Sequence, residues 1–473
     1  MVQEQINFDK MFLMLLPVAF FFILILLDGL LLKYASILVI ALAFYEIVVY
    51  HKRYIYGLTA LRIISLPALT FVTFTVFIAI PAVHIAAINP HRGETFFLAV
   101  SSFFFIYPAG LFVGDLTRTV KYSSIQRLTG SSLFPRPTDE FYFKLLVLLF
   151  IVCSLGFVLY LSRVETVPLF YLLQDPGNAI QARILREEAF KLLDMTVFEA
   201  YFYSWMRALF YPIGVIGSLF IAYKYRVKKY WLLFTVFFGT GILFNALTLE
   251  KAPSAAIFLS VIAFFFVKEE KVSLRFILIA IVAVFSIPAI IIIMHYSERT
   301  NLAEMVWIGI TNRIFVVPSE VLYQYFRTFP DIHDFLLGRS TNLTAWLHPK
   351  GLFEINHYIM GVWHGIVYTT GSANANYLGY YWADYGPEGL VLSTFLVGYI
   401  VHLLYWKLLD VSEYRKDINY IAIICYLVPL FTLNFFSANF SILFFTKGIL
   451  LVIIYMFIYQ YYLKKNQGNL ELA

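Results

Sequence analysis

Charge is scarce in this sequence: Asp, Glu, Lys and Arg make up only 14% of its 473 residues. A typical soluble domain has about 25% charged and 45–50% apolar residues, whereas here 61% are hydrophobic and 19% are aromatic. So few charges cannot cover a surface in water, which excludes a soluble enzyme, a disordered protein and a nucleic-acid binder. The apolar residues fall into runs of about 20, the length of a helix that crosses a ~30 Å hydrocarbon core. The sequence therefore predicts an all-α, polytopic integral membrane protein.

Cysteine and the common cofactor motifs are also nearly absent. The two cysteines, Cys153 and Cys425, both lie in apolar runs, which argues against a disulfide framework or a metal cluster. The sequence has no H-E-x-x-H, no D-x-D and no Gly-rich phosphate loop. We therefore expect neither a metal nor a cofactor. The first residues lack the basic start of a signal peptide, so we expect the first apolar run to be retained.

Hydrophobic runs divide the whole chain into about 12 expected transmembrane helices, in a single membrane domain over 1–473. The twelve runs are 11–32, 35–50, 63–88, 95–115, 143–162, 203–224, 231–248, 252–267, 276–295, 388–407, 420–437 and 443–462. Lys and Arg concentrate in the short loops at every second crossing. Because basic loops stay on the cytoplasmic side, we expect both termini in the cytoplasm.

Two longer segments then fall on the external side, at about 163–202 and 296–387. In the first, apolar residues from Ile184 to Leu193 recur at helical spacing between charges, which is typical of an amphipathic helix on the membrane surface. In the second, Pro318 opens an expected short helix that stops before Pro330. Its many aromatic residues favour a folded cap on the bilayer.

Arginine is enriched on this external side, against the usual bias. The nine arginines assigned there are Arg92, Arg163, Arg183, Arg186, Arg207, Arg299, Arg313, Arg327 and Arg339. A guanidinium offers a rigid fork for phosphate or carboxylate. One interpretation is an anion site; the other is that each arginine pairs with a nearby carboxylate such as Glu187, Glu298 or Glu320.

Four basic residues stand out because they lie at membrane depth: Arg207, Lys251, Arg313 and Lys447. Charges at that depth usually face a cavity or a partner. Together they predict an outward-facing polar cavity suited to a lipid-linked phosphate or pyrophosphate. Alternatively, Lys251 pairs with Glu250 and Lys447 extends to the interface.

The stretch from Asn312 onward reads NRIFVVPSEVLYQYF, then FLLGRS, then GSANANYLGYYWADYGPEGLVLSTFLVG. This order resembles the Wzy-type O-antigen polymerases, the bacterial enzymes that polymerise lipid-linked oligosaccharide repeat units. The likeness rests on the Arg-led segment, the long external loop, the N-x-x-G entry and the aromatic-x-x-[YF]-G-x-x-G turn. The TLEKAP segment around Lys251 is similar as well. At residue level the resemblance covers roughly 250–255 and 310–400.

The resemblance implies a GT-C-like fold and a metal-independent glycosyltransferase of the bacterial inner membrane. Its donor and acceptor would both be undecaprenyl-pyrophosphate-linked glycans, joined at the periplasmic face during O-antigen (lipopolysaccharide) or related polysaccharide biosynthesis. A Wzz-type co-polymerase would be the expected partner for chain-length control, together with the lipid bilayer.

Site residues follow from the charges and from the resemblance together. The expected pyrophosphate-binding residues are Arg313 and Arg207 first, then Arg186, Arg327, Lys251 and Lys447. The candidates for activating the acceptor hydroxyl are His348, His357, His364, Asp384 and Glu388. The acceptor and loop residues are Asn374, Asn376, Tyr377 and Tyr385. For Asp384 and Glu388 the alternative role is to stabilise the start of the tenth span, since acidic residues favour a helix N-terminus.

Three other functions remain as alternatives. O-antigen ligases carry a His-Asn pair before a similar Tyr-Leu, but here the stretch is Asn374-Ala375-Asn376-Tyr377-Leu378, without a histidine. A transporter or flippase of lipid-linked or anionic substrates predicts charges near the midplane and broken helices in matched positions. A receptor or structural membrane protein would use the large loop to bind a partner, but it leaves the external arginines unexplained.

Overall fold

The computed structural model describes residues 8–27, 29–136, 139–174, 181, 184–185, 195–249, 251–269, 308–309, 311–365 and 371–470. These residues form helices and turns, and no strand occurs among them. Eight of the described helices are long and apolar enough to cross a membrane: Gly29–Lys52, Leu66–Ile88, Gly93–Thr117, Asp139–Arg163, Val197–Tyr225, Lys228–Leu247, Ala252–Glu269 and Tyr377–Val411. The all-helical, polytopic class is confirmed. The run at 276–295 and most of the amphipathic segment lie outside the described residues, so the number 12 stays a prediction.

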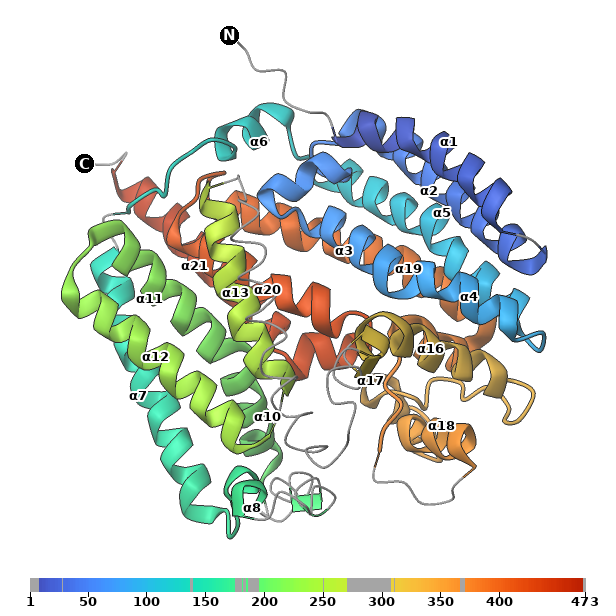
Figure 1. Cartoon of the computed structure of the whole chain (residues 1–473). Coiled ribbons are helices and arrows are strands. Elements are labelled where there is room, and N and C mark those ends of the chain that lie inside the picture. Colours follow the sequence, from blue (N-terminus) through green and yellow to red (C-terminus); the bar gives the residue numbers. More distant parts are fainter. Residues whose placement is uncertain are drawn as a thin grey trace. The chain divides into compact units, whose positions relative to one another are not determined.

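The chain folds as two compact units, each built from separated stretches of sequence. Unit 1 comprises Met1–Gln126, Thr311–Trp406 and Asn434–Ser441, and unit 2 comprises Arg127–Ile310, Lys407–Leu433 and Ile442–Ala473. The colours of Figure 1 follow this interleaving, with both early and late helices in each unit.

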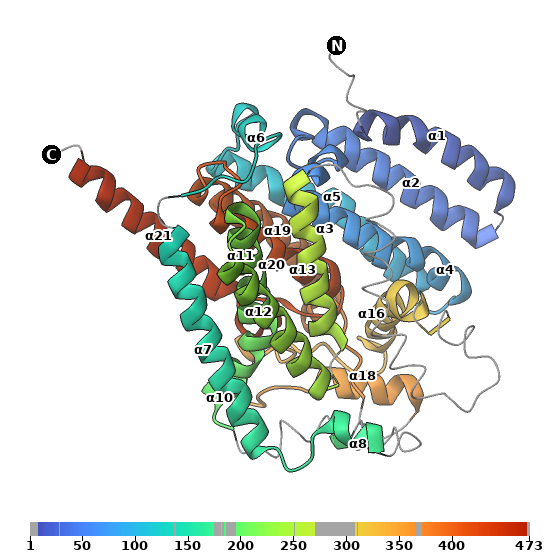
Figure 2. The same ribbon diagram turned by 60° about the vertical axis from the view of Figure 1, so that its left-hand side comes forward.

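Unit 1 packs its first helices against one another, and Figures 1 and 2 both show α1 and α2 side by side. Its helices are α1 (Phe8–Leu26), α2 (Gly29–Val49), α3 (Leu66–Phe74), α4 (Ile80–Ile88), α5 (Gly93–Thr117), α16 (Val317–Thr328), α17 (Asn342–Ala345), α18 (Ile355–His364) and α19 (Tyr377–Val411) as far as Trp406. α1 ends at Leu26 and α2 begins at Gly29, which has a positive φ of 52°, whereas the sequence predicted the break between residues 32 and 35. The helix predicted from Pro318 is confirmed as α16.

Helices α5 and α19 approach so closely that their contact requires glycine. A Cβ on Gly110 would lie 2.1 Å from the Phe395 carbonyl oxygen, and one on Gly398 would lie 2.3 Å from that of Tyr107. Gly110 and Gly114 form a G-x-x-x-G pair, the spacing that lets membrane helices pack backbone to backbone. This contact joins the early and late sequence of unit 1.

Helix α19 is longer than the tenth run that the sequence predicts. It begins at Tyr377 instead of 388, and at Gly386 (φ 61°, ψ −140°) it departs from helical geometry. Gly386-Pro387 therefore kinks a helix that continues on both sides, whereas we expected it to end a loop. As a result Tyr377, Asp384 and Tyr385, which we predicted to be in the loop, lie on helix.

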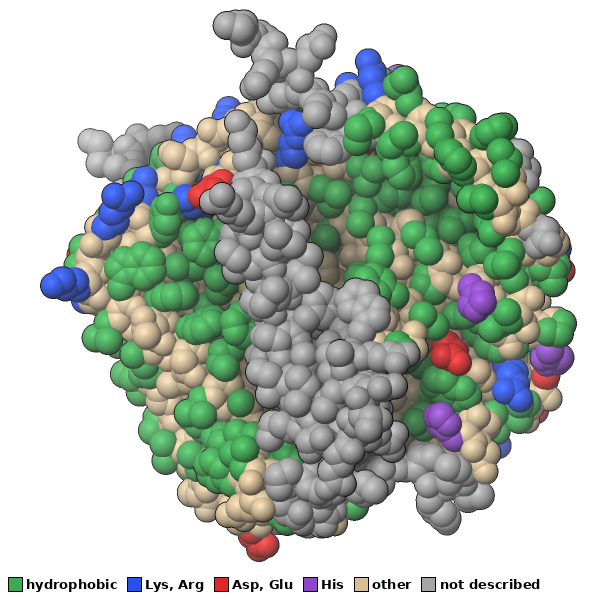
Figure 3. All heavy atoms as spheres, viewed as in Figure 1, with side chains coloured by type: hydrophobic (Ala, Val, Ile, Leu, Met, Phe, Trp, Pro, Cys, Tyr) green, Lys and Arg blue, Asp and Glu red, His purple; other side chains and the backbone are tan. Residues whose placement is uncertain are grey.

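The two ends of unit 1 carry different charged groups. At one end Lys52 pairs with Asp115 (2.9 Å) and the Arg118 guanidinium lies over the Trp406 ring. At the other end the Tyr323 hydroxyl donates to the His91 carbonyl (2.8 Å), which ties α16 to the turn between α4 and α5. In Figure 3 histidine, basic and acidic side chains gather over this second part, and hydrophobic side chains surround them on the face that is shown. The basic residues that we predicted on opposite sides of the membrane thus lie at opposite ends of unit 1.

Unit 2 is a bundle around α11, which packs on α7, α12, α13 and α20. Its described helices are α7 (Asp139–Arg163), α8 (Pro168–Gln174), α10 (Val197–Trp205), α11 (Tyr211–Tyr225), α12 (Lys228–Leu247), α13 (Lys251–Glu269), α20 (Ile418–Pro429) and α21 (Ile449–Leu470). At the end where α7 and α20 begin, Arg136 forms an ion pair with the buried Asp417 (2.6 Å). A buried ion pair fixes how the two helices begin relative to each other.

Candidate functional site

The two arginines that we expected first at a pyrophosphate site lie in matching local structures. Arg207 is the second residue of the π-helical turn η4 (Met206–Phe210), and Arg313 is the second residue of η5 (Asn312–Val316). Such turns are rare and frequently occur at functional sites. Arg207 belongs to unit 2 and Arg313 to unit 1.

Proline explains why the helix widens at both places. Pro212 and Pro318 each lie five residues after the arginine, an Arg-x-x-x-x-Pro spacing. Proline has no N–H to donate, and its ring collides with the carbonyl four residues earlier. That carbonyl belongs to the third residue of each π turn, so the turn opens there. The same arrangement occurs without arginine at η3 (Thr75–Ala79), which precedes Pro81.

The surroundings of these two arginines differ. Arg313 is exposed, and no ion pair forms to it among the residues that the structure describes. The part-buried Arg207 donates from Nε to the Tyr203 carbonyl (3.3 Å). Arg327, on the last turn of α16, is exposed and donates from Nη1 to Gln324 Oε1 (3.5 Å). Arg313 and Arg327 therefore present guanidinium groups from the two ends of one short helix.

Two other arginines that we assigned to the external side are neutralised by carboxylates. Arg92 forms two hydrogen bonds with Asp331, one from Nε to Oδ2 at 2.7 Å, and Arg163 pairs with Glu199 at 2.8 Å. The Arg92 guanidinium holds the pKa of the Asp331 carboxyl below its usual value. For these two arginines the ion-pair interpretation is right, although with partners that the sequence did not indicate.

The remaining basic candidates belong to unit 2 or lie outside the described residues. Lys447 directly follows another π turn, η7 (Ile442–Thr446). That segment adjoins the Arg207 turn, because the Trp205 indole donates to the Phe445 carbonyl (2.7 Å) and Gly448 lies against Leu209. Lys251 begins α13, which also contacts the Arg207 turn. Arg186 lies outside the described residues.

The two late segments that carry the resemblance are hydrogen-bonded together in unit 1. The amides of Leu336 and Leu337 donate to the carbonyls of Ala383 (2.8 Å) and Asp384 (3.0 Å). The buried Asp384 carboxylate accepts from the Ser340 amide (3.1 Å) and hydroxyl (2.5 Å). The Asp384 oxygens thus hold the 336–340 turn. This favours a structural role for Asp384 over that of the base that activates a hydroxyl.

Glycine is required within this turn. Gly338 has a φ of 92°, and a Cβ there would lie 2.4 Å from the Tyr385 hydroxyl oxygen. The exposed Tyr385 ring therefore extends across the turn, next to the kink in α19. Tyr385 keeps its place as a candidate surface contact for a substrate.

A second polar network joins α16, α18 and the start of α19. Asn356 Oδ1 accepts hydrogen bonds from the hydroxyls of Tyr325 (3.0 Å) and Tyr380 (2.7 Å), and the Tyr325 hydroxyl also lies 2.9 Å from the Ala373 carbonyl. The sequence did not single out these three side chains, since only folding brings α18 onto the other two helices. The network holds α18 rigidly beside α16.

The predicted loop residues around Asn376 have distinct environments. Asn376 is buried and its Oδ1 accepts from the Leu378 amide (3.1 Å), so it turns the chain into α19. Tyr377 is also buried and stacks on Phe440, while the exposed Asn374 donates to the Ser372 hydroxyl (3.2 Å). Asn376 and Tyr377 therefore serve the fold, and Asn374 remains accessible.

Hydrogen bonds distinguish the three histidines proposed as bases. His357 Nδ1 lies 3.0 Å from the Gly371 carbonyl, which can only accept, so Nδ1 carries the proton and Nε2 presents a lone pair. His348 has the opposite tautomer, because its Nδ1 accepts from the Lys350 amide (3.2 Å). His364 stacks on Trp363 (4.9 Å between ring centroids). His357, exposed on α18, has the geometry of a general base.

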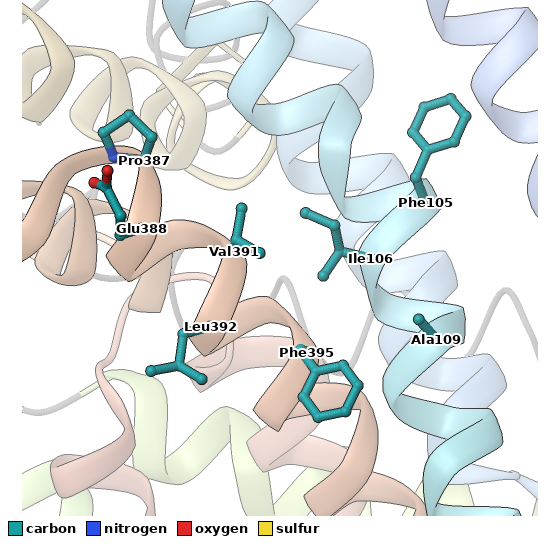
Figure 4. Close-up of a pocket in the computed structure, with 8 residues that line it drawn as sticks. All are labelled: Phe105, Ile106, Ala109, Pro387, Glu388, Val391, Leu392 and Phe395. Carbon is teal, nitrogen blue, oxygen red and sulfur yellow. The ribbon is translucent and has the colours of Figure 1, made fainter.

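Two further acidic side chains, Glu320 and Glu388, are weaker candidates for the base that activates the hydroxyl. Glu320 in the first turn of α16 is about half buried; burial raises its pKa, and the nearby His364 opposes that shift. Glu388 is exposed in the first turn after the kink of α19, at the end of an apolar groove (Figure 4). Among the described residues, no cluster of three or more His, Cys, Asp or Glu could hold a metal ion.

Comparison with known proteins gives no relative for this chain: no family model, curated protein or solved structure matches it.

Proposed function

We propose that this protein is a membrane glycosyltransferase that polymerises undecaprenyl-pyrophosphate-linked repeat units at the periplasmic face of the inner membrane. The observation that carries the proposal is that unit 1 contains both an exposed guanidinium, in a π turn, and an imidazole of fixed tautomer. The Arg313 turn contacts α16, and α16 contacts α18, which bears His357. A cation for a leaving pyrophosphate and a base for a hydroxyl are the two groups that this reaction needs.

In the proposed step, an acceptor hydroxyl oxygen attacks the anomeric carbon of the donor sugar. The bond from that carbon to the pyrophosphate oxygen breaks, and the hydroxyl proton passes to His357 Nε2. The lipid pyrophosphate leaves as an anion, which Arg313 stabilises through bidentate hydrogen bonds. Arg207 and Lys447 of unit 2 remain candidate pyrophosphate-binding residues on adjoining segments of that unit.

The direct test is incubation of the purified full chain with an undecaprenyl-pyrophosphate-linked repeat unit in detergent, followed by gel analysis of the glycan. We expect a ladder of longer products. His357→Gln should reduce the rate about 10²- to 10⁴-fold, the range for loss of a general base. His348→Gln is the matched control and should change the rate little, because its Nδ1 is occupied by a backbone amide.

Absence of any ladder with a suitable donor would reject the polymerase. Equal loss in His357→Gln and His348→Gln would keep the reaction but remove His357 as its base. A release of lipid pyrophosphate without chain growth would instead indicate transfer to another acceptor, as in a ligase.

A transporter remains a second candidate because of one side chain. Glu46 lies within the candidate span α2, and both of its carboxylate oxygens are buried without a hydrogen-bond partner in the part of the chain that the structure describes. Buried ionisable groups in spans often belong to ion or proton pathways. Flux of a lipid-linked oligosaccharide across proteoliposomes that is abolished by Glu46→Gln would favour this function.

A further inference from the structure

An apolar groove of about 750 Å³ runs between α5 and α19 of unit 1 (Figure 4). It is lined by Phe105, Ile106, Ala109, Pro387, Glu388, Val391, Leu392 and Phe395. Its volume falls within the range of small-ligand sites, about 300–1,000 Å³. Phe105 is 43% exposed and Leu392 61% exposed, so the groove opens toward the surroundings of unit 1 along its side.

The paths of the two helices explain why the groove exists and where it stops. The backbone contact of Gly110 with Phe395 and Gly398 leaves no space between α5 and α19 beyond Ala109. Toward the kink at Gly386, the two helices separate and larger side chains line the opening. The result is a wedge, closed at the glycine contact and open toward Glu388.

The length of the groove selects its occupant. From Glu388 to Phe395 is seven residues, or about 10 Å along a helix, whereas one leaflet of the ~30 Å hydrocarbon core is about 15 Å deep. A transmembrane helix would have to continue past the glycine contact, where the groove is closed. A hydrocarbon chain that stays within one leaflet fits.

Glu388 defines the other end of this site. It is exposed, and within the described part of the chain no hydrogen bond or ion pair involves its carboxylate. The part of α19 after the kink, from Pro387 to Val411, has 25 residues and is about 37 Å long, enough to cross the bilayer from Glu388 onward. Glu388 therefore lies near the boundary of the hydrocarbon core, where phospholipid head groups are found. A carboxylate there attracts a cationic group and repels a purely anionic one.

We propose that this groove binds one acyl chain of a phospholipid whose primary ammonium head group pairs with Glu388. The aromatic rings of Phe105 and Phe395 and the aliphatic side chains hold the chain by apolar contact. The ammonium supplies the hydrogen-bond donor that the carboxylate lacks. This site does not depend on the proposed polymerase activity, since any protein with this groove would bind the lipid.

The test is native mass spectrometry of the purified full chain with phosphatidylethanolamine or phosphatidylglycerol of identical acyl chains. We expect the first equivalent of phosphatidylethanolamine to be retained about threefold better, as for an exposed ion pair. Glu388→Gln should remove this preference while still binding both lipids. Leu392→Trp and Ala109→Phe, which fill the groove at two places, should each lower the retention of both lipids severalfold.

Leu116→Trp is the matched control, because Leu116 is 85% exposed on the same helix α5 but lies outside the groove. It should leave retention of both lipids unchanged. Equal retention of the two lipids by the wild-type chain would overturn the proposal, as would a preference that survives Glu388→Gln. Wild-type retention in both groove-filling variants would do the same. Size-exclusion chromatography of every variant identifies any that misfolds, and the Glu388→Gln measurement stands without the other two.

Discussion

The turns around Arg207 and Arg313 have the same local structure but different environments. Each is a five-residue π turn with arginine in second place and proline five residues later. Yet the Arg207 side chain is partly buried and bonds to its own helix, whereas Arg313 is exposed. Local sequence therefore determines the shape of such a turn, and the surrounding fold determines whether its arginine can reach a ligand.

In the comparison of the two turns, the largest expected effect comes from replacing the arginines themselves. Arg313→Ala should lower polymerisation about 10²- to 10³-fold, the usual loss when a group that stabilises transition-state charge is removed. Because Arg313 is exposed, the melting temperature of this variant should not change. Arg207→Ala should lower the melting temperature as well as the activity, since it removes a partly buried side chain.

Activity assays combined with thermal unfolding check this contrast. Arg313→Lys should recover only part of the activity, because an ammonium keeps the charge without the bidentate geometry. Full activity of Arg313→Lys or Arg313→Ala would remove Arg313 from the site.

A smaller effect is expected from the prolines, which open the turns without touching a ligand. Pro318→Ala and Pro212→Ala should let the π turn close to an α-helix and rotate each arginine away, with a loss of about 10- to 100-fold from misplacement alone. Pro81→Ala provides the control, because it follows a π turn of the same length that lacks arginine. If all three variants retained wild-type activity, the shape of the turns would have no functional role.

The smallest effect concerns the pH dependence of stability around α16. Burial raises the pKa of Glu320, because the folded protein disfavours its charged form. The free energy of unfolding therefore falls as the pH rises and this carboxyl ionises. Glu320→Gln should therefore raise the melting temperature at pH 8, by about 1 °C, and have no effect near pH 4.

For Asp331 the pH dependence of stability has the opposite sign, because Arg92 lowers the pKa of its carboxyl. Its contribution is present above the unfolded value of about 3.9 and is lost as the pH falls through the lower folded value. Asp331→Asn should thus lower the melting temperature at pH 7 and have little effect in strong acid. Differential scanning fluorimetry over this pH range measures both, and equal signs for the two variants would contradict the assignment.

The features that depend on composition and local spacing could be predicted from the sequence. The apolar runs predicted the membrane helices, and the apolar sequence around Arg207 and Arg313 marked both residues as candidates for an anion site. The Arg-x-x-x-x-Pro spacing was present in the sequence too, and it was the missed signal for the π turns.

Contacts between distant residues were beyond such reasoning. Arg92 meets Asp331 and Ser340 meets Asp384 only after folding, so nothing in the sequence excluded Arg92 or Asp384 from the site. The same holds for the histidines, because the tautomer of His357 depends on a carbonyl 14 residues away. The kink was missed for a different reason: Gly386-Pro387 is a loop signal, but the chain stays helical up to it, where contacts with Phe335 and the 336–337 amides hold it.

The glycine contact between α5 and α19 also has a consequence for biogenesis. Gly110 and Gly398 are separated by about 290 residues, and a ribosome adding 5–20 residues per second needs roughly 15–60 s for that interval. During this time the G-x-x-x-G face of α5 has no native partner in the bilayer. Unit 1 can be completed only after most of the chain has been inserted, so insertion factors that shield this face should matter for its yield.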